Sequence, residues 1–355
     1  MSASPRPFRA LAPALLLLLA TPAAADIFVA TGAKILSFFN FDSDDAMPHR
    51  EISSALTGID LAGSLALDVV HREIWVSDLT LARVSVFDMD ADGDVMPLRV
   101  IDAVALDSPR GLMIDLVHDE VYVVDFVSNA VFVFPRTQNG NAAPVRTLAG
   151  DLTGIEGPVQ GFLDLVHDEL FVASIGGSGA GIAVFDRATA SGNVAPLRVL
   201  GGTGGAGSGL DNPRGMYVDL VTDRLVVAEY DINALRLYPR TASGGTAFLA
   251  EIAGPATGLQ KPFDLVADRF GELIVGTDTL VNPSVRVYAA VSGDQPPDRV
   301  ITGPSTGFAA TIGIASDFAR DCSWGKSIDG CIQRDNFERG DFCYWNQVTG
   351  GAGCP

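Results

Sequence analysis

Lysine is scarce in this chain of 355 residues, which carries it only at Lys34, Lys261 and Lys326. Arginine and lysine together number 24 against 43 acidic residues, so the formal net charge is −19. A surface of this sign repels phosphate backbones and anionic lipid, so we do not expect nucleic acid as a partner. Charged residues make up only 19% of the chain and hydrophobic ones 48%, a composition that excludes intrinsic disorder.

Long hydrophobic runs are also missing, except near the N-terminus. Arg6 and Arg9 precede an apolar run over residues 11–20, which is too short to span a bilayer comfortably. Small residues follow over 21–25, and this succession is typical of a secretory signal peptide. We expect cleavage after Ala25, a secreted or periplasmic protein, and no transmembrane segment.

Motifs of common catalytic sites are absent as well. The chain has no nucleophile elbow, no phosphate-binding loop and no His-Glu-x-x-His sequence. The glycine-rich stretch 201–209 has no Lys-Ser or Lys-Thr pair after it, so we interpret it as a loop between strands. No catalytic residue is predicted on these grounds.

What the sequence does contain is a repeat. The block 108–125, which begins Ser-Pro-Arg-Gly, recurs as the block 212–229. The aspartate at the centre of each block marks the unit, which occurs six times at a period near 50 residues. Several short apolar segments per unit at this period predict the four-stranded blade of a β-propeller. The markers are Asp68, Asp115, Asp164, Asp219, Asp268 and Asp317.

The two ends of the repeat region complement each other. The last marker is preceded by one strand only, whereas the segments 27–30, 35–38 and 48–50 supply three more. We therefore predict one all-β domain over residues 26–318, a six-bladed β-propeller of four-stranded blades. Strands from both chain ends close its last blade, which protects the sheet edges.

The repeated pattern of Pro-x-Gly, three apolar residues and Asp, followed by a strand that ends in Asp or Glu, resembles the NHL-type repeat of six-bladed propellers. The resemblance covers residues 26–318. It departs from the usual NHL unit because an Asp-x-x-Gly turn is replaced by Asp-(Leu/Val)-Val-His-Asp-Glu in several copies. Relatives include binding modules, lactonases and lyases, so this likeness implies a fold and leaves the function open.

The resemblance also places two sets of positions on one face, around the central channel. The ends of the second strands carry Thr31, Asp78, Asp125, Ser174, Glu229 and Thr277, with Asp278 next. The positions before the first strands carry Gly63, Arg110, Gln160, Arg214, Phe263 and Ile312.

Two kinds of chemistry are expected at this rim. Clustered carboxylates suit a metal such as Ca²⁺, with Asp78, Asp125, Glu229 and Asp278 as candidate ligands. Arginines suit a carboxylate or sulfate, which makes Arg110, Gln160, Arg214 and Phe263 candidate ligand-binding residues. The alternative is structural, with Arg110 paired to Asp125 and Arg214 paired to Glu229 within their blades.

An acidic stretch offers a second candidate metal site. Oxygen ligands alternate ahead of and after Gly93, as in the first half of a calcium loop. The position at which an EF-hand needs glutamate is Arg99, so Ca²⁺ binding and a solvated acidic turn both remain open. The candidate ligands are Asp88, Asp90, Asp92 and Asp94. Three histidines at equivalent turns, His71, His118 and His167, are expected to be exposed on the opposite face.

All cysteines lie in the last segment, at Cys322, Cys331, Cys343 and Cys354. Their spacing is too wide for a Cys-x-x-Cys zinc site, and an even count in an exported chain predicts two disulfides with three ways of pairing. We expect residues 319–355 to form a separate disulfide-rich tail. The stretch 335–345 resembles the ends of secreted bacterial proteins.

These observations favour a secreted, monomeric, non-catalytic propeller that binds a protein or a glycan. The first alternative is a metal-dependent hydrolase of lactonase or esterase type, with its site at the channel mouth. The second alternative is a structural envelope or matrix protein stabilised by Ca²⁺ on its acidic loops. A lyase is disfavoured, because no histidine is expected on the rim.

Overall fold

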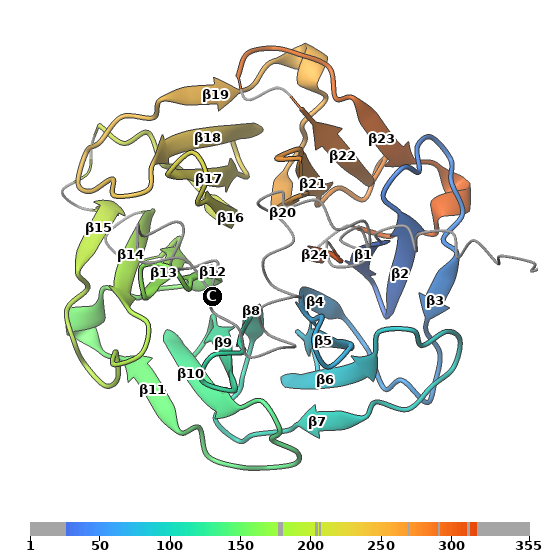
Figure 1. Ribbon diagram of the computed structural model, residues 1–355, viewed down its shortest axis with the longest axis horizontal. Coiled ribbons are helices and arrows are strands. Elements are labelled where there is room, and N and C mark those ends of the chain that lie inside the picture. The colour runs from blue at the N-terminus through green and yellow to red at the C-terminus, as the bar shows by residue number, and fades with distance from the viewer. Residues whose placement is uncertain are drawn as a thin grey trace, which may run out of the picture.

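The computed structural model describes residues 26–317, except 177–179, 203–204, 206, 269, 290–291 and 311–312. It is a ring of six four-stranded sheets around a central axis, as predicted (Figure 1). The predicted signal peptide, the predicted disulfide-rich tail and Ile312 lie outside the described residues. Across the part of the chain that is described, no helix has the length and apolar character needed to cross a membrane.

Each blade runs from an innermost first strand to an outermost fourth strand (Figure 1). Blade 1 contains β4 (Ala62–Asp68), β5 (Glu73–Asp78), β6 (Arg83–Asp88) and β7 (Arg99–Ile101). Blade 2 contains β8 (Pro109–Asp115), β9 (Glu120–Asp125), β10 (Ala130–Pro135) and β11 (Arg146–Ala149). Blade 3 contains β12 (Pro158–Asp164), β13 (Glu169–Ser174), β14 (Gly181–Asp186) and β15 (Arg198–Gly201).

The second half of the ring has the same plan. Blade 4 contains β16 (Pro213–Asp219), β17 (Arg224–Glu229), β18 (Ala234–Pro239) and β19 (Ala250–Ile252). Blade 5 contains β20 (Pro262–Ala267), β21 (Leu273–Thr277), β22 (Ser284–Tyr288) and β23 (Arg299–Thr302). Blade 6 contains β24 (Gly313–Ser316), β1 (Asp26–Thr31), β2 (Lys34–Phe39) and β3 (Arg50–Ile52). Short 3₁₀ helices follow the fourth strands of blades 2, 4 and 5: η1 (Asp151–Thr153), η3 (Pro255–Thr257) and η4 (Pro304–Thr306).

The marker aspartate closes the turn between the first and second strands. Asp115 Oδ1 accepts the backbone N–H of Val117 at 2.9 Å and that of His118 at 3.2 Å. The residue before the second strand is left-handed, with φ of 56° at both Asp119 and Asp168. Aspartate tolerates this conformation better than bulky or β-branched residues do. Blades 2, 3 and 4 carry aspartate at this position, and blade 1 carries Arg72 with φ of 57°.

Blade 6 confirms the predicted ring closure. The C-terminal β24 is its innermost strand, and the N-terminal β1, β2 and β3 form the rest. Ile27 stands opposite Ser316 in the antiparallel β1–β24 pair, and the Asp317 N–H donates to the Asp26 carbonyl at 2.9 Å. One sheet thus holds both ends of the propeller, and the ring is shut.

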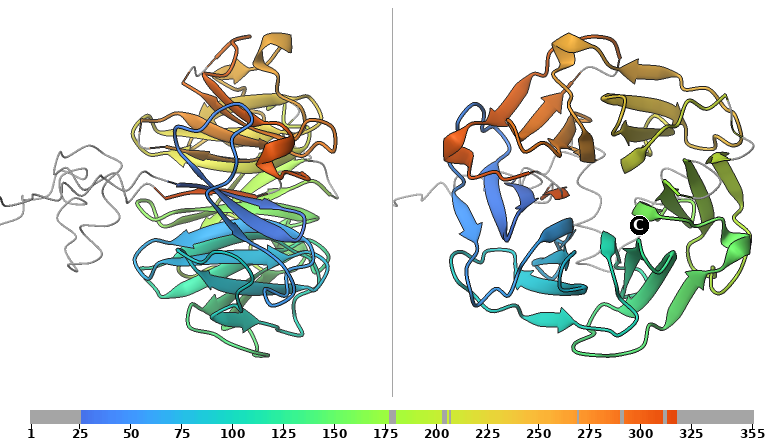
Figure 2. Two further views of the ribbon diagram at one scale, coloured as in Figure 1. Left: turned by 90° about the vertical axis from the view of Figure 1, so that its right-hand side faces the viewer. Right: turned by 180° about the vertical axis from the view of Figure 1, so that it is seen from behind.

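The hydrophobic core lies between neighbouring blades. One cluster joins Trp75 and Val86 of blade 1 to Val121 and Phe132 of blade 2, and the Trp75 side chain is fully buried. Both faces of an inner strand are therefore covered, which explains the continuous apolar run over residues 121–124. The ring seen edge-on is accordingly a thick disc of stacked sheets (Figure 2).

The outer edges of the blades are covered by loops of the following blade. Gly93, between the third and fourth strands of blade 1, forms a parallel bridge to Ile52 in β3. The same bridge recurs at every junction, and Asp44 against Ile301 closes the ring. These bridges use backbone groups that would otherwise leave an open sheet edge.

Candidate functional site

We call the face at which the first strands begin and the second strands end the upper face, and the opposite one the lower face. In β8 the register shifts between Pro109 and Gly111, which leaves Arg110 in a β-bulge. Similar shifts place Arg214 and Phe263 at bulges in β16 and β20. A bulge redirects a side chain away from the regular pleat. These predicted rim residues therefore sit at the upper mouth of the channel because of bulges that the sequence did not reveal.

The carboxylates that end the second strands hold the adjacent loops in place. Asp125 Oδ2 accepts the N–H groups of Asp107 at 2.8 Å and Ser108 at 2.9 Å, and Oδ1 accepts that of Ser128 at 2.9 Å. Asp78 accepts three backbone N–H groups at 2.8–3.0 Å in a similar arrangement. Both carboxylates are buried, so these bonds replace lost hydration.

Glu229 and Asp278 complete the predicted metal set, but their surroundings differ. Glu229 is buried, and its Oε2 accepts the N–H groups of Asp211 and Asn212 at 3.0 Å each. Burial raises the pKa of Glu229 to about 6. The half-buried Asp278 instead accepts the Tyr230 hydroxyl at 2.9 Å. The structure thus does not bring the four predicted ligands together, because no such group lies within 4.8 Å among the described residues.

Arg110 does not form the ion pair with Asp125 that was one of the sequence alternatives. The two oxygens of that carboxylate are already bonded to backbone N–H groups. The Arg110 guanidinium instead lies over Phe126, with Cζ 4.0 Å from the ring centroid, and its Nε is buried without a described partner. Burial lowers the pKa of Arg110, because no nearby charge offsets the loss of water.

Arg214 lies beside two aromatic rings rather than pairing with Glu229. Its Cζ is 4.9 Å from the centroid of Tyr230 and 5.5 Å from that of Phe263. Its Nε and Nη1 are buried and have no hydrogen-bond partner among the residues described. Burial lowers the pKa of Arg214 most, and the charge of Arg110 lowers it further. The two guanidiniums therefore repel each other across the channel mouth.

Gln160 lies one position deeper than the sequence register predicted. It pairs with Ala173 as Gly111 pairs with Val124, so Val159 takes the bulge position that corresponds to Arg110. Gln160 stands four residues before its marker Asp164, whereas Arg110 stands five residues before Asp115, so the deeper position follows from the count along the chain. Polar residues and glycine alternate around the axis at this deeper level: Ser64, Gly111, Gln160, Gly215, Asp264 and Gly313.

The three polar residues of this level form the floor of the channel mouth. Gln160 Nε2 lies 3.4 Å from both Ser64 Oγ and Asp264 Oδ1. Asp264 also accepts the N–H groups of Leu265 at 2.9 Å and Ile314 at 3.1 Å. Burial raises the pKa of Asp264 to about 7. A titratable carboxyl group therefore lies near the axis. Its neighbours Phe263 and Gly215 belong to the bulges of β20 and β16.

The acidic stretch 88–94 directs its later carboxylates to the neighbouring blade. Asp92 Oδ1 accepts the Glu51 N–H at 2.9 Å, and Asp94 Oδ1 accepts the Leu56 N–H at 2.7 Å. These bonds need an oxygen acceptor rather than a negative charge. Two asparagines make the same contacts one blade further on: Asn139 and Asn141.

The earlier carboxylates of this stretch are engaged separately. Asp88 Oδ1 accepts the Asp90 N–H at 2.8 Å, and Asp90 pairs with Arg50 at 3.0 Å and also with Arg72. The candidate calcium ligands thus serve as turn acceptors and ion-pair partners, and they form no three-residue group within 4.8 Å.

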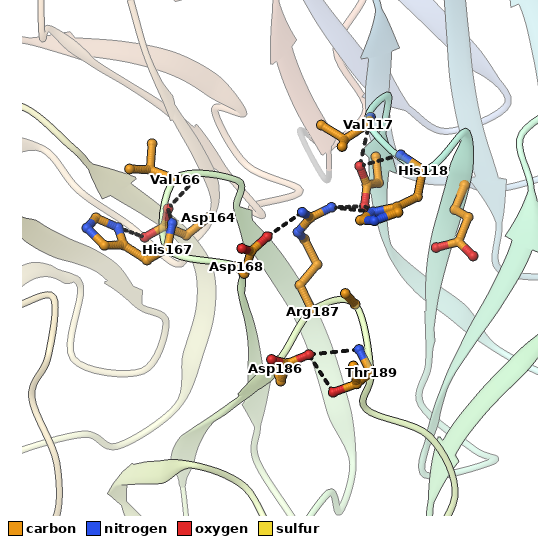
Figure 3. A network of polar contacts seen from close by, with 12 residues as sticks. Val117, His118, Asp164, Val166, His167, Asp168, Asp186, Arg187 and Thr189 are labelled. Carbon is orange, nitrogen blue, oxygen red and sulfur yellow. Dashed lines mark hydrogen bonds and ion pairs between the residues drawn. The ribbon is translucent and has the colours of Figure 1, made fainter. Parts of the chain in front are cut away.

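The three turn histidines lie on the lower face and keep side-chain exposures of 40–45%, as expected. Each Nδ1 also contacts the marker aspartate of its own turn at 2.8–2.9 Å, which the sequence did not predict. Figure 3 shows two of these turns beside Arg187. The pairs are His71–Asp68, His118–Asp115 and His167–Asp164.

Arg187 joins blades 2 and 3 on the lower face (Figure 3). Only 3% of its side chain is exposed, and it pairs with Asp115 of blade 2 and, at 2.5 Å, with Asp168 of its own blade. Asp115, His118 and Glu120 are the one described group with the spacing of a metal site. Arginines already occupy its carboxylates, so we do not interpret it as one.

The arginine that begins the fourth strand in five of the six blades has a role that the sequence analysis did not predict. Arg99 binds both oxygens of Glu73, at 2.8 and 2.7 Å, and its Cζ lies 5.4 Å from the Trp75 ring. Blades 2, 3 and 6 also pair the corresponding arginine with the acid that begins the second strand, and in blade 5 the partner is Glu272, directly before β21. In blade 4 both partners are replaced, by Ala250 and Arg224. This joint replacement was the signal available in the repeat. The arginines with an acidic partner are Arg50, Arg99, Arg146, Arg198 and Arg299.

Comparison with known proteins agrees with this architecture. No protein-family model and no curated protein matches the chain. A chain in the crystal structure of a nidogen/laminin complex aligns with a TM-score of 0.62 and 16% identity, over 82% of this chain and 98% of that one. A functionally unknown protein from Desulfotomaculum acetoxidans DSM 771 aligns with a TM-score of 0.53 and 11% identity, over 82% and 83% of the two chains.

The fold and the ring closure define the class of this protein, a six-bladed β-propeller. At identities this low, structural likeness establishes the fold alone, and function has to be argued from the site.

Proposed function

We propose that the chain is an exported, NHL-like propeller that acts as a non-catalytic binding scaffold for a protein or a glycan. The partner binds at the upper channel mouth, where an anionic group contacts Arg110 and Arg214. The observation that carries this proposal is a pair of partly buried guanidiniums without an ion-pair partner among the described residues. Guanidinium is well matched to carboxylate and sulfate oxygens.

The electrostatics of the two arginines support the proposal. Desolvating a charge without a partner costs free energy, and two like charges near each other increase that cost. Burial lowers the pKa of Arg110 and of Arg214, and the charge of Arg110 lowers that of Arg214 further. A bound anion offsets these costs, so it is stabilised more here than at a solvated arginine.

The hydrolase alternative receives less support from the geometry. The oxygens of Asp78 and Asp125 accept backbone N–H groups, and Glu229 leaves only Oε1 without a partner. Scaffold function is also supported by the alignment with a chain of the nidogen/laminin complex, a protein–protein complex. We also propose that the chain is exported, on the basis of residues 1–25, and that disulfides stabilise a tail over residues 319–355.

Thermal unfolding tests whether anions bind at the channel mouth. Acetate and sulfate are each compared with chloride at equal ionic strength. We expect an anion at ten times its Kd to stabilise the chain by about 1.4 kcal/mol, which corresponds to a rise in Tm of about 2–4 °C.

The double variant Arg110→Gln and Arg214→Gln provides the comparison. It should lose the site-specific rise and keep only the general stabilisation that sulfate confers on folded proteins. Arg72→Gln is the matched control, because Arg72 is a surface arginine paired with Asp90. An equal anion response in the double variant and the wild type would contradict the proposal.

A further inference from the structure

Exposed carboxylates lie on the same face as the two arginines of the channel mouth. The residue eight positions before the marker aspartate is acidic and exposed in four consecutive blades, and we call this set the acidic arc. Along these four blades the upper face therefore carries a row of negative charge beside the two arginines. The members of the acidic arc are Asp60, Asp107, Glu156 and Asp211.

The buried carboxylates of the second strands fix the position of the arc. The Asp107 N–H donates to Asp125 at 2.8 Å, and the Asp211 N–H donates to Glu229 at 3.0 Å. The backbone of Asp60 is anchored in the same way to Asp78, and the Glu156 carbonyl accepts the Gly176 N–H at 2.9 Å, while the carboxylates of all four arc residues stay in solvent. The arc is thus a rigid feature of the face rather than a set of free loop charges.

The acids nearest to Arg214 are engaged with other groups. Asp231 pairs with Lys261 at 2.6 Å and accepts a hydrogen bond from Asn212 at 2.8 Å, while Asp278 accepts the Tyr230 hydroxyl. These bonds hold negative charge next to Arg214 without neutralising it. The site thus combines two guanidinium groups that have no ion-pair partner among the described residues with carboxylates whose positions are fixed by other hydrogen bonds.

We infer that the partner at this site is a protein segment with a single carboxylate flanked by basic residues. This inference rests on the proposed function and narrows it. A carboxylate side chain contacts Arg110 and Arg214 at the centre, and lysine or arginine on either side contacts the acidic arc. Such a segment complements both charge zones at once.

Other anionic partners match the face less well. A sulfated or uronic-acid polymer, or a strongly acidic peptide, gains the central contact but repeats negative charge over the acidic arc. The chain also has a formal net charge of −19, which repels polyanions over a longer range. A glycan with one acidic sugar matches the centre and leaves the arc unused.

Selection from a displayed library of random peptides, with the purified full chain as bait, tests the inference. We expect enrichment of peptides with one Asp or Glu between basic residues. An enriched peptide made synthetically should bind about tenfold more weakly to the Arg110→Gln and Arg214→Gln double variant, and about tenfold more weakly when its own acid is replaced by the amide. Arg72→Gln again serves as the control.

A second variant separates this inference from the proposed function. Asp107→Lys with Asp211→Lys should weaken the basic-flanked peptide without reducing acetate stabilisation, since the added positive charge favours any bound anion. Enrichment of polyacidic peptides, of peptides insensitive to the arginine substitutions, or of none at all would overturn the inference. The proposed anion site itself would stand or fall on the acetate and sulfate melts.

Discussion

At the scale of single residues, two groups of arginine differ in their partners. Arg99 and its equivalents in blades 2, 3 and 6 face an acid and lie over an aromatic ring, so they are stabilised within the sheet. Arg110 and Arg214 keep the aromatic contact but have no acid, because backbone N–H groups occupy the carboxylates nearest in sequence. This difference is the reason for placing the binding site at the channel mouth.

Asp264 provides a prediction about pH at the same scale. Its pKa in the folded chain is raised to about 7 by burial, against 3.8 in an unfolded chain. The folded state therefore holds the proton more tightly, so the contribution of Asp264 to stability is fully present below pH ~4 and is lost as the pH rises through ~7. Relative to Asp264→Asn, the wild type should lose roughly 4 kcal/mol between these limits.

Urea unfolding of both proteins at acidic and at mildly alkaline pH measures this difference. Asp107→Asn is the control, because Asp107 has an exposed carboxylate and should show no comparable change. A constant difference between wild type and Asp264→Asn across the range would show that the Asp264 carboxyl does not titrate in this interval.

At the scale of elements, three buried arginines form ion pairs across the junctions between blades, and we call them wedges: Arg136, Arg187 and Arg240. Arg187 contacts Asp115 and His118 of blade 2 and Asp168 of blade 3. Arg136 and Arg240 occupy the corresponding positions at the junctions on either side. Each wedge neutralises acids whose burial would be costly without it.

Arg187→Met should therefore destabilise the chain by about 3–5 kcal/mol, since it leaves Asp115 buried without its cation. Urea unfolding at neutral pH measures the change. Arg224→Met is the matched control, because Arg224 begins a second strand and has no ion pair among the described residues. Equal stabilities of the two variants would refute the wedge role.

The acidic loop gives a second prediction at this scale. Asp94 caps the loop of blade 6 through the Leu56 N–H, and Asn141 does the same for Val104. We expect Asp94→Asn to be as stable as the wild type and Asp94→Ala to be less stable by about 1 kcal/mol. EDTA should leave the Tm of all three unchanged. A fall in wild-type Tm with EDTA that Asp94→Asn abolishes would instead indicate bound Ca²⁺.

At the scale of the whole molecule, the ring is stabilised unevenly. Three consecutive junctions carry a buried arginine after the third strand, whereas the other three carry Ala289, Asn40 and Met89. The junction between blades 4 and 5, which has no wedge, contains a cavity of about 60 Å³ that is lined in part by Tyr217 and Arg224. The three junctions without a wedge therefore depend for their stability on closure of the ring through blade 6.

Truncation tests this dependence on closure. A chain that ends at Thr302 loses β24, exposes the inner edge of β1 and opens the ring. We expect it to aggregate or to elute as an expanded species in size-exclusion chromatography. A chain that ends at Asp317 keeps all twenty-four described strands and serves as the control. A compact, cooperatively unfolding product of the shorter truncation would contradict the closure argument.

The sequence by itself determined the blade number, the strand positions and the shared sixth blade. These features follow from local hydrophobic pattern and turn chemistry, which repeat with the chain and are visible in the marker aspartates. The rim positions Arg110, Arg214 and Phe263 were predicted from the resemblance to NHL-type propellers, which places the starts of the first strands on one face.

Only the tertiary structure decided how those rim residues are used. Backbone N–H groups took the carboxylates that were expected to bind metal or arginine. The Arg187 guanidinium donates to Asp115, which lies 72 positions earlier in the chain. Such contacts depend on how blades stack and what each buried group must satisfy, and neither is encoded in the period of the repeat.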